Sequence, residues 1–168
     1  MSAVVVYESM FGSTRAVAEA VAAGLGGATL LEVGAFLGGP EHGALPADVT
    51  LLVVGGPTHA FGLSRPGTRK DAEAKFGPTI SAIGVREWLD QLQVPQDLAV
   101  AAFGTKLASP LAGSAARGIA QRLRKLGGRL LLPAQDFFVP GTVGLDETLL
   151  DDARAWGAKV AAAAGARD

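Results

Sequence analysis

The strongest constraint on the fold is a series of short apolar runs, each followed by Gly, Ser or Thr, which alternate along the chain with segments of helical spacing. Three of these runs are continuous, at 4–7, 49–55 and 98–103. A continuous apolar run indicates a strand that is buried on both faces, which is typical of parallel sheets covered by crossover helices. The alternation of such strands with helices predicts an α/β fold with right-handed connections.

Two more segments complete the expected sheet. Residues 29–33 are expected as a second strand, and residues 130–139, interrupted by Pro133, as a fifth strand at an edge. The expected helices share apolar residues at helical spacing: 14–25, a short helix around Trp88, a helix after Ser114 and a helix after Asp146. We predict a doubly wound sheet of five parallel strands in the order 2-1-3-4-5, within one domain over residues 1–168.

Two segments have a weaker pattern. Residues 34–48 contain Gly and Pro and predict no definite helix. Residues 56–83 have the composition of turns, with at most one short helix near 68–74. Long loops of this kind in a compact domain are usually functional or disordered, so the second segment is a candidate for part of a functional site.

Composition excludes several classes of function. The chain has 15 Lys and Arg against 16 Asp and Glu residues, a net charge of −1, so no basic field for nucleic acid exists. With no Cys and two His, thiolate metal sites and Cys nucleophiles are excluded, and no metal site is expected. No apolar run approaches the roughly 18 residues of a membrane span, and the first residues form no leader. We therefore expect a cytoplasmic protein with no membrane partner.

The turn between the first strand and the first helix is a candidate phosphate site. It contains three hydroxyl residues, Ser9, Ser13 and Thr14, together with Gly12. A helix N-terminus exposes unpaired N–H groups and the positive end of the helix dipole, which favour an anion. The turn lacks both the dinucleotide and the nucleoside-triphosphate glycine patterns, so a terminal monophosphate is favoured. The alternative is that Ser13 or Thr14 only caps the helix.

The same stretch carries a resemblance to a known family. The residues that fill every specified position of the flavodoxin signature are Val5, Val6, Tyr7, Ser9, Gly12, Thr14, Ala18 and Val21. The chain therefore resembles the flavodoxin family, which implies a flavodoxin-like fold and an FMN cofactor. The resemblance implies that the FMN phosphate is held by Ser9, Gly12, Ser13 and Thr14, with backbone N–H groups of Met10 and Phe11.

The resemblance places one side of the flavin ring at the loop after the third strand. The candidate residues there are Pro57, Thr58, His59, Ala60, Phe61 and Gly62. His59 and Phe61 have flat side chains that could stack on a flavin or lie at its edge. Gly56 and Gly62 are candidates for a carbonyl that accepts a hydrogen bond from reduced flavin. The alternative is that Phe61 fills the core and His59 is an ordinary surface histidine. The loop also resembles that of the tryptophan-repressor-binding-protein type of quinone reductase.

The loop after the fourth strand is expected near the pyrimidine end of the ring. Its candidate residues are Phe103, Gly104, Thr105 and Lys106. The sequence departs from familiar flavodoxins here, because no Tyr after Tyr7 is present to cover the flavin. Lys106 is a second departure, since low-potential flavodoxins surround the ring with negative charge. We hypothesise that Lys106 stabilises reduced flavin and raises its potential. The alternative is a solvated, distant Lys106.

A basic segment lies next to the proposed site. Arg65, Arg69 and Lys70 could dock an acidic partner or a phosphate-bearing reductant such as NADPH, or they could belong to a solvated loop. Three functions follow. The first is an electron carrier between a reductase and an acceptor, although carrier flavodoxins are strongly acidic. The second is an FMN reductase that uses NAD(P)H to reduce quinones. The third is a module of this fold that binds no flavin.

Overall fold

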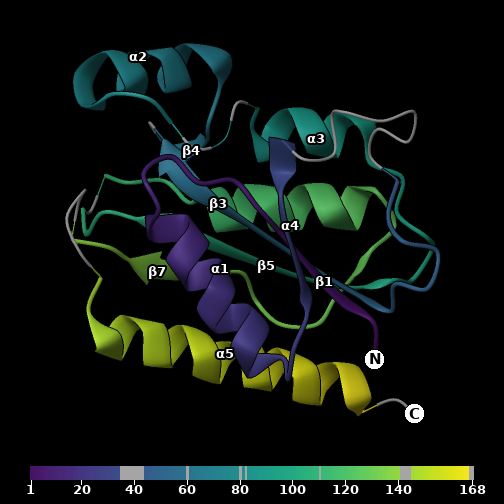
Figure 1. Cartoon of the computed structure of the whole chain (residues 1–168). Helices are drawn as coiled ribbons and strands as arrows, with labels where there is room; N and C mark the ends of the chain where they lie inside the picture. The colour runs from purple at the N-terminus through teal and green to yellow at the C-terminus, as the bar shows by residue number, and fades with distance from the viewer. Residues whose placement is uncertain are drawn as a thin grey trace.

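A parallel sheet forms the centre of the molecule in the computed structural model (Figure 1), which describes residues 1–34, 44–59, 61–79, 81, 83–109, 111–140 and 145–166. Its long strands are β1 (Ala3–Tyr7), β2 (Thr29–Glu32), β3 (Leu51–His59) and β5 (Ala99–Lys106). All neighbouring pairs among them are parallel. Because each strand is apolar on both faces, the sheet is buried between two layers of helices. The predicted α/β doubly wound fold class is confirmed.

The last part of the sheet differs from the prediction. The expected fifth strand is broken into β6 (Arg129–Leu130) and β7 (Gln135–Phe138), which pair with opposite ends of β5. Pro133 lies between them, where its missing N–H prevents a continuous ladder. A further short strand, β4 (Gly62–Leu63), pairs antiparallel with the end of β3. The order β2-β1-β3-β5-β6 therefore follows the predicted arrangement, but the sheet has seven strands rather than five.

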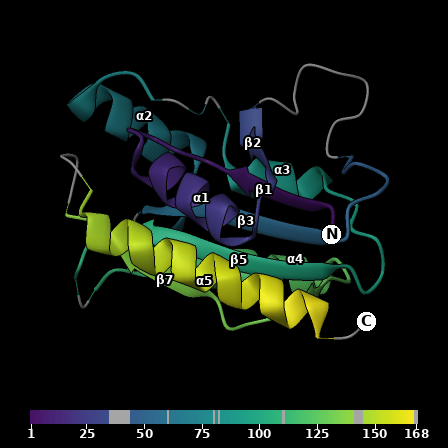
Figure 2. The ribbon, with the colours of Figure 1, turned by 60° about the horizontal axis from the view of Figure 1, so that its bottom comes forward.

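Helices cover both faces of the sheet (Figures 1 and 2). On one face lie α1 (Ser13–Gly24) and α5 (Glu147–Gly165), and on the other lie α3 (Val85–Gln91) and α4 (Ala115–Lys125). Side chains that alternate along β1 enter different cores, with Val5 on the α1 and α5 side and Val6 on the α3 and α4 side. None of the helices in the described residues combines the length and apolar character needed to cross a membrane.

One helix stands apart from these layers. The short helix expected near residues 68–74 is present as the longer α2 (Pro66–Phe76), beyond the carboxyl ends of the strands (Figure 1). Its buried residue is Arg69, so an ion pair rather than an apolar face attaches it to the rest of the fold. The prediction for residues 34–48 falls largely on residues 35–43, which lie outside the described residues.

Candidate functional site

A cleft of about 570 Å³ lies at the carboxyl ends of β1, β3 and β5. This volume is within the usual range for sites that bind small molecules. The three loops that the sequence singled out meet there. From them, the residues that line the cleft are Met10, Phe11, Ser13, Thr14, Pro57, Thr58, His59, Thr105 and Lys106. In open α/β sheets ligands bind at this edge, which makes the cleft the candidate site.

The first loop presents backbone donors to the cleft. Gly12 is the N-cap of α1 with φ of 105°, a conformation that suits glycine, and the N-cap position makes no side-chain cap bond. The alternative that Ser13 or Thr14 caps α1 is therefore wrong. Among the described residues, no acceptor pairs with the N–H groups of Met10, Phe11, Ser13 and Thr14. Four unpaired donors at the positive end of a helix dipole form a ready anion site.

Ser9 lies under this loop rather than on the cleft surface. It is fully buried, and its hydroxyl oxygen accepts hydrogen bonds from the N–H groups of Gly12 (3.1 Å) and Arg15 (3.3 Å). Its own N–H donates to the Ser81 hydroxyl at 2.9 Å, and its carbonyl accepts from the Ser81 N–H at 3.0 Å. The hydroxyl of Ser9 therefore shapes the turn from within, and Ser81 fixes the turn to a distant part of the chain.

A buried hydroxyl pair joins the first and third loops. The side-chain oxygens of Thr14 and Thr105 are 2.7 Å apart, and both residues are buried. Neutral hydroxyl pairs of this kind hold two loops without adding charge. The pair therefore fixes the start of α1 against the end of β5 on the floor of the cleft.

The second loop divides between the cleft and its surroundings. Thr58 accepts a hydrogen bond from the N–H of Ala115 at 3.0 Å, which holds this loop against the start of α4. Burial, and then the charge of Arg69, lower the pKa of His59, so the imidazole is neutral at pH 7. Phe61 does not line the cleft: it is 73% exposed, so the alternative that it fills the core is wrong. Gly62 lies in β4, and Ala60 falls outside the described residues.

The third loop contributes only its later residues. Phe103 is fully buried on the α5 side, where its ring makes edge contacts with Phe137 and Trp156 at centroid distances of 6.3 and 6.1 Å. Gly104 is also buried in the sheet. Both were candidate cofactor residues, and neither lines the cleft, because the strand continues to Lys106 and carries them below the site.

Lys106 lines the cleft but is already paired. Its ammonium lies 3.8 Å from a carboxylate oxygen of Asp136 and donates to the carbonyls of Gly113 (3.2 Å) and Ala112 (3.4 Å). Its side chain is 14% exposed, which rules out the alternative of a solvated, distant lysine. Because Asp136 offsets part of the charge, the effect of Lys106 on a ligand is smaller than that of a free cation. Its influence on a flavin potential stays a prediction.

The opposite wall of the cleft comes from α2, which sequence reasoning did not assign to the site. The additional lining residues are Thr68, Asp71, Ala72, Lys75, Phe76, Leu107 and Val139. The rings of Phe11 and Phe76 make an edge contact, with centroids 5.7 Å apart. They supply aromatic surface that the missing tyrosines would otherwise provide. A signal was available, because Phe76 is a lone large apolar residue at the end of a polar helix, just before Gly77.

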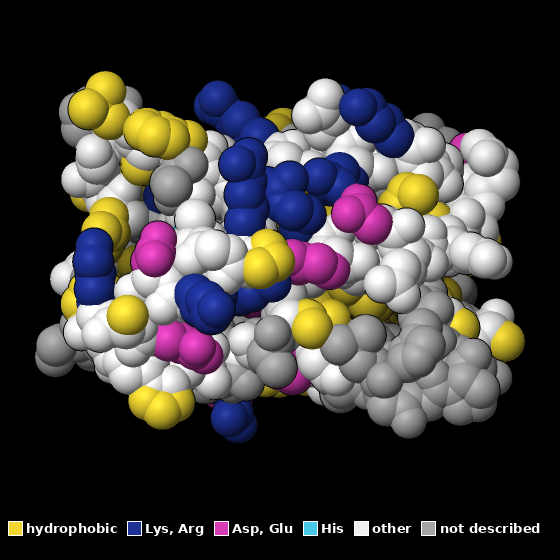
Figure 3. Space-filling model, turned by 90° about the horizontal axis from the view of Figure 1, so that it is seen from above, with side chains coloured by type: hydrophobic (Ala, Val, Ile, Leu, Met, Phe, Trp, Pro, Cys, Tyr) yellow, Lys and Arg dark blue, Asp and Glu magenta, His cyan; other side chains and the backbone are white. Residues whose placement is uncertain are grey.

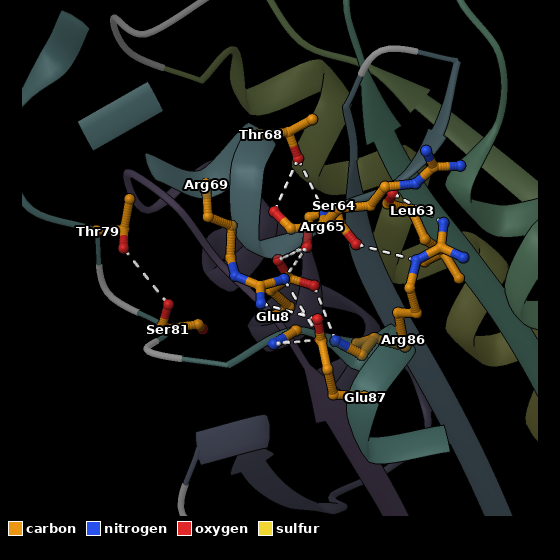
Figure 4. A network of polar contacts seen from close by, with 12 residues as sticks. Glu8, Leu63, Ser64, Arg65, Thr68, Arg69, Thr79, Ser81, Arg86 and Glu87 are labelled. Carbon is orange, nitrogen blue, oxygen red and sulfur yellow. Dashed lines mark hydrogen bonds and ion pairs between the residues drawn. The ribbon is translucent and has the colours of Figure 1, made fainter. Parts of the chain in front are cut away.

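A buried polar network attaches α2 and α3 to the first loop (Figure 4). Glu8, which precedes Ser9, is fully buried; one carboxylate oxygen accepts from the Ser64 hydroxyl and the other from the N–H of Val85 at 2.9 Å. Burial raises the pKa of Glu8, although these hydrogen bonds and the charge of Arg69 oppose the rise. The network therefore contains a buried carboxyl group in the residue next to Ser9.

Arg69 is the centre of this network. Its guanidinium donates to the Ser64 hydroxyl and pairs with the Glu87 carboxylate, both at 2.9 Å. Burial alone would raise the pKa of Glu87, but the hydrogen bond and charge of Arg69 together with backbone N–H groups outweigh it, and the pKa is lowered. The three cations of the basic segment therefore have different surroundings. Arg69 is 8% exposed and lies inside the protein, whereas Arg65 and Lys70 are exposed to solvent.

The described residues contain no group of three or more His, Asp or Glu side chains that could hold a metal ion. What the cleft does offer is a set of fixed N–H donors at one end and flat, largely apolar side chains around it. This arrangement suits a ligand that has a monophosphate at one end and an aromatic ring system at the other.

Solved structures share this fold, although no protein-family model and no curated protein matches the chain. A flavodoxin from the domain Archaea matches with a TM-score of 0.66 and 22% identity, over 98% of this chain and 99% of its own. A WrbA-like flavodoxin from Agrobacterium tumefaciens gives 0.60 and 24%, over 97% and 96%. Oxidised Flavodoxin 2 from Bacillus cereus gives 0.67 and 18%, over 96% and 98%. The predicted flavodoxin-like fold is confirmed.

Proposed function

From this flavodoxin-like fold and its cleft, we propose that the chain binds FMN non-covalently and carries electrons between a reductase and an acceptor protein. The observation that carries the proposal is the set of four N–H groups, in the turn before α1 and at its start, that have no partner among the described residues; the residues that carry them line a cleft of about 570 Å³. These donors suit a phosphate dianion without any cationic side chain. FMN supplies one- or two-electron transfer when it is bound.

The residues present fit the cofactor in chemistry as well as in volume. The N–H groups of Met10 to Thr14 would bind the phosphate, and Thr14 would keep that end rigid through its bond to Thr105. The flat side chains of Phe11, Phe76 and His59 would orient the ring and exclude water from it. A neutral His59 adds a donor and an acceptor at the ring without adding charge.

The proposal is tested by titrating the purified protein, freed of any flavin, with FMN and with riboflavin, and following flavin absorbance. Riboflavin has the same ring but no phosphate, so it is the matched control for the anion site. We expect FMN to bind at least about 100-fold more tightly than riboflavin, because several charge-assisted hydrogen bonds are lost without the phosphate. Equal binding of the two ligands would contradict the phosphate site, and binding of neither would favour a module that uses no flavin.

A second candidate function is an NAD(P)H-dependent FMN reductase that acts on quinones. The observation that favours it is the charge near the cleft, where Arg65 and Lys70 are exposed and the whole chain is near neutral. Rapid oxidation of NAD(P)H by a quinone with the FMN-loaded protein alone would favour the reductase. Turnover that requires an added reductase would favour the carrier. The partner protein and a cytoplasmic location stay predictions.

A further inference from the structure

A second depression, of about 360 Å³, lies beside the cofactor cleft. It is bounded by β4, the start of α2, α3 and α4, and we call it the arginine groove after Arg65, Arg86 and Arg122, which line it. His59 and Thr68 line both the arginine groove and the cofactor cleft. A ligand in the groove would therefore lie next to a ligand in the cleft.

The three arginines come from three different elements and lack compensating acids in the groove. Among the described residues that line it, none is Asp or Glu. The side chain of Arg65 has no hydrogen-bond or ion-pair partner in the described part of the chain, and Arg86 donates to the carbonyls of Leu63 (3.1 Å) and Ser64 (3.2 Å). Arg122 is paired with Asp90 at 2.7 Å. Neither Arg65 nor Arg86 therefore has an ion-pair partner among the described residues, although the charges of Glu87 and Asp90 act on Arg86.

Figures 3 and 4 show where basic side chains lie on this side of the molecule. Figure 3 shows Lys and Arg side chains gathered in one region of the face seen from above α2 and α3. Figure 4 shows the side chains of Arg65 and Arg86 on the same side of the Leu63 segment, away from Glu8. The two arginines therefore face the same space. The carboxylates of the buried network are bonded to other groups, Glu8 to Ser64 and Val85 and Glu87 to Arg69.

The repulsion between these neighbouring cations is unfavourable unless an anion binds between them. Burial, and then the charges of Arg122 and Arg65, lower the pKa of Arg86. Guanidinium groups present planar forks of donors that match phosphate oxygens, and an anion would remove the repulsion between them. The groove is also next to the first residues of two helices, since Arg65 precedes α2 and Ser114 precedes α4. The positive ends of both helix dipoles add to the same preference.

An aromatic ring completes the groove. Phe61 lines it with φ of 80°, which is costly for a bulky side chain, and the ring is 73% exposed. Its backbone is held there by Gly113, where an added Cβ would lie 1.6 Å from the Phe61 carbonyl oxygen. Strained residues that the surrounding structure holds in place are often functional. An exposed flat ring beside cationic side chains suits a nucleobase, because bases stack on aromatic faces.

We propose that the arginine groove binds a phosphate-bearing nucleotide, with phosphate on Arg65, Arg86 and Arg122 and the base against Phe61. Binding at the groove stands on its own geometry. The further role as the site of a dinucleotide reductant such as NADPH rests on the proposed function, because only a flavin in the neighbouring cleft would make such a ligand useful.

Calorimetric titration of the full-length protein with adenosine 2′,5′-bisphosphate, using adenosine as the unphosphorylated control, tests the proposal. We expect the bisphosphate to bind and adenosine to bind at least about tenfold more weakly. Added salt should weaken the binding of the bisphosphate. The changes Arg65→Gln and Arg86→Gln should each weaken the binding of the bisphosphate about tenfold. Arg124→Gln removes the same charge from α4 at an exposed position outside the groove and should have no effect.

Arg65→Gln guards against a folding artefact, because Arg86 also holds the Leu63 and Ser64 carbonyls, whereas the Arg65 side chain has no such task. The proposal is overturned if the two ligands bind equally, if Arg65→Gln retains the wild-type affinity, or if Arg124→Gln weakens binding as much. Binding of poly-glutamate in preference to the bisphosphate would also overturn it, in favour of an acidic protein partner. The same sample titrated with FMN reports on the cofactor cleft separately, so failure of one site leaves the other interpretable.

Discussion

The cleft proposed for the cofactor and the arginine groove lie side by side, yet the anion sites proposed for them are built by opposite means. The cleft offers four backbone N–H groups from one turn, fixed by Gly12 and a buried Ser9. The groove offers charged side chains that three separate elements bring together. Backbone donors cannot be removed by substituting side chains, whereas each arginine can be. The comparison teaches that the cleft depends on conformation and the groove on charge.

The largest expected effect comes from disturbing the conformation of the cleft. Gly12→Ala places a side chain at φ of 105°, where no neighbour lies within 4 Å, so the cost is strain in the turn rather than a clash. We expect FMN affinity to fall about 10- to 100-fold, which corresponds to about 1–3 kcal/mol of strain. Flavin titration checks this, with Gly165→Ala, at the end of α5, as the control.

The same variant sharpens the comparison between the sites. Binding of adenosine 2′,5′-bisphosphate should be unchanged in Gly12→Ala, because Gly12 does not line the arginine groove. Equal losses at both sites would show that the turn supports the whole carboxyl edge, and the distinction between conformation and charge would then be wrong.

A smaller effect is expected from the network that joins the two sites. Arg69→Met keeps most of the apolar side chain but removes the ion pair with Glu87 and the bond to Ser64. Breaking a buried pair costs about 3–5 kcal/mol, but the Glu87 side chain is 30% exposed, so we expect about 1–2 kcal/mol. Urea unfolding measures the loss, and Lys70→Met, at an exposed neighbour, should change stability by less than about 0.5 kcal/mol.

Arg69→Met has a second readout that stability alone does not give. The pKa of His59 is lowered by burial and then by the charge of Arg69, so the variant should raise it. Titration of the His59 resonances in NMR spectra follows this change. An unchanged pKa of His59 would mean that the network does not act on the boundary between cleft and groove.

The smallest effect is a pH dependence that originates at Glu8. Its pKa is raised in the folded state, so the native protein holds this proton more tightly than the unfolded chain. The resulting stability is present below the unfolded pKa and is lost as pH rises through the folded pKa. The stability of the wild type minus that of Glu8→Gln should therefore fall with rising pH, by at most about 1.4 kcal/mol per pH unit. A constant difference in urea unfolding from pH 4 to 8 would contradict this.

The sequence predicted the scaffold well where the signal was local. Continuous apolar runs identified β1, β3 and β5, and the change to helical spacing identified α1, α4 and α5. The broken fifth strand was harder, because Pro133 can end a strand or only mark an edge. In the site, Thr14 and Thr105 were found separately as loop residues, but their contact joins positions 91 residues apart.

Two features of the site could be decided only by the tertiary structure. Phe103 ends the apolar run 98–103, which does not show on which side its ring lies. Only its packing against Trp156 shows that the ring belongs to the core and not to the cleft. Phe76 reaches the cleft because the ion pair of Arg69 holds α2 over the carboxyl edge. Neither outcome can be obtained from periodicity, which describes a residue's neighbours along the chain and not those across it.

By itself, the sequence determined the turn proposed to bind an anion and the sheet that carries it. A strand, a glycine with positive φ and a helix start are set by residues that are adjacent in the chain. Only the tertiary structure decided which charged side chains are buried and paired and which are exposed. It buried Arg69 against Glu87, left the side chain of Arg65 without a partner among the described residues and brought it beside Arg86 and Arg122. The reason is physical: backbone donors are fixed by local dihedral angles, whereas the effect of a charged side chain depends on which distant groups share its space.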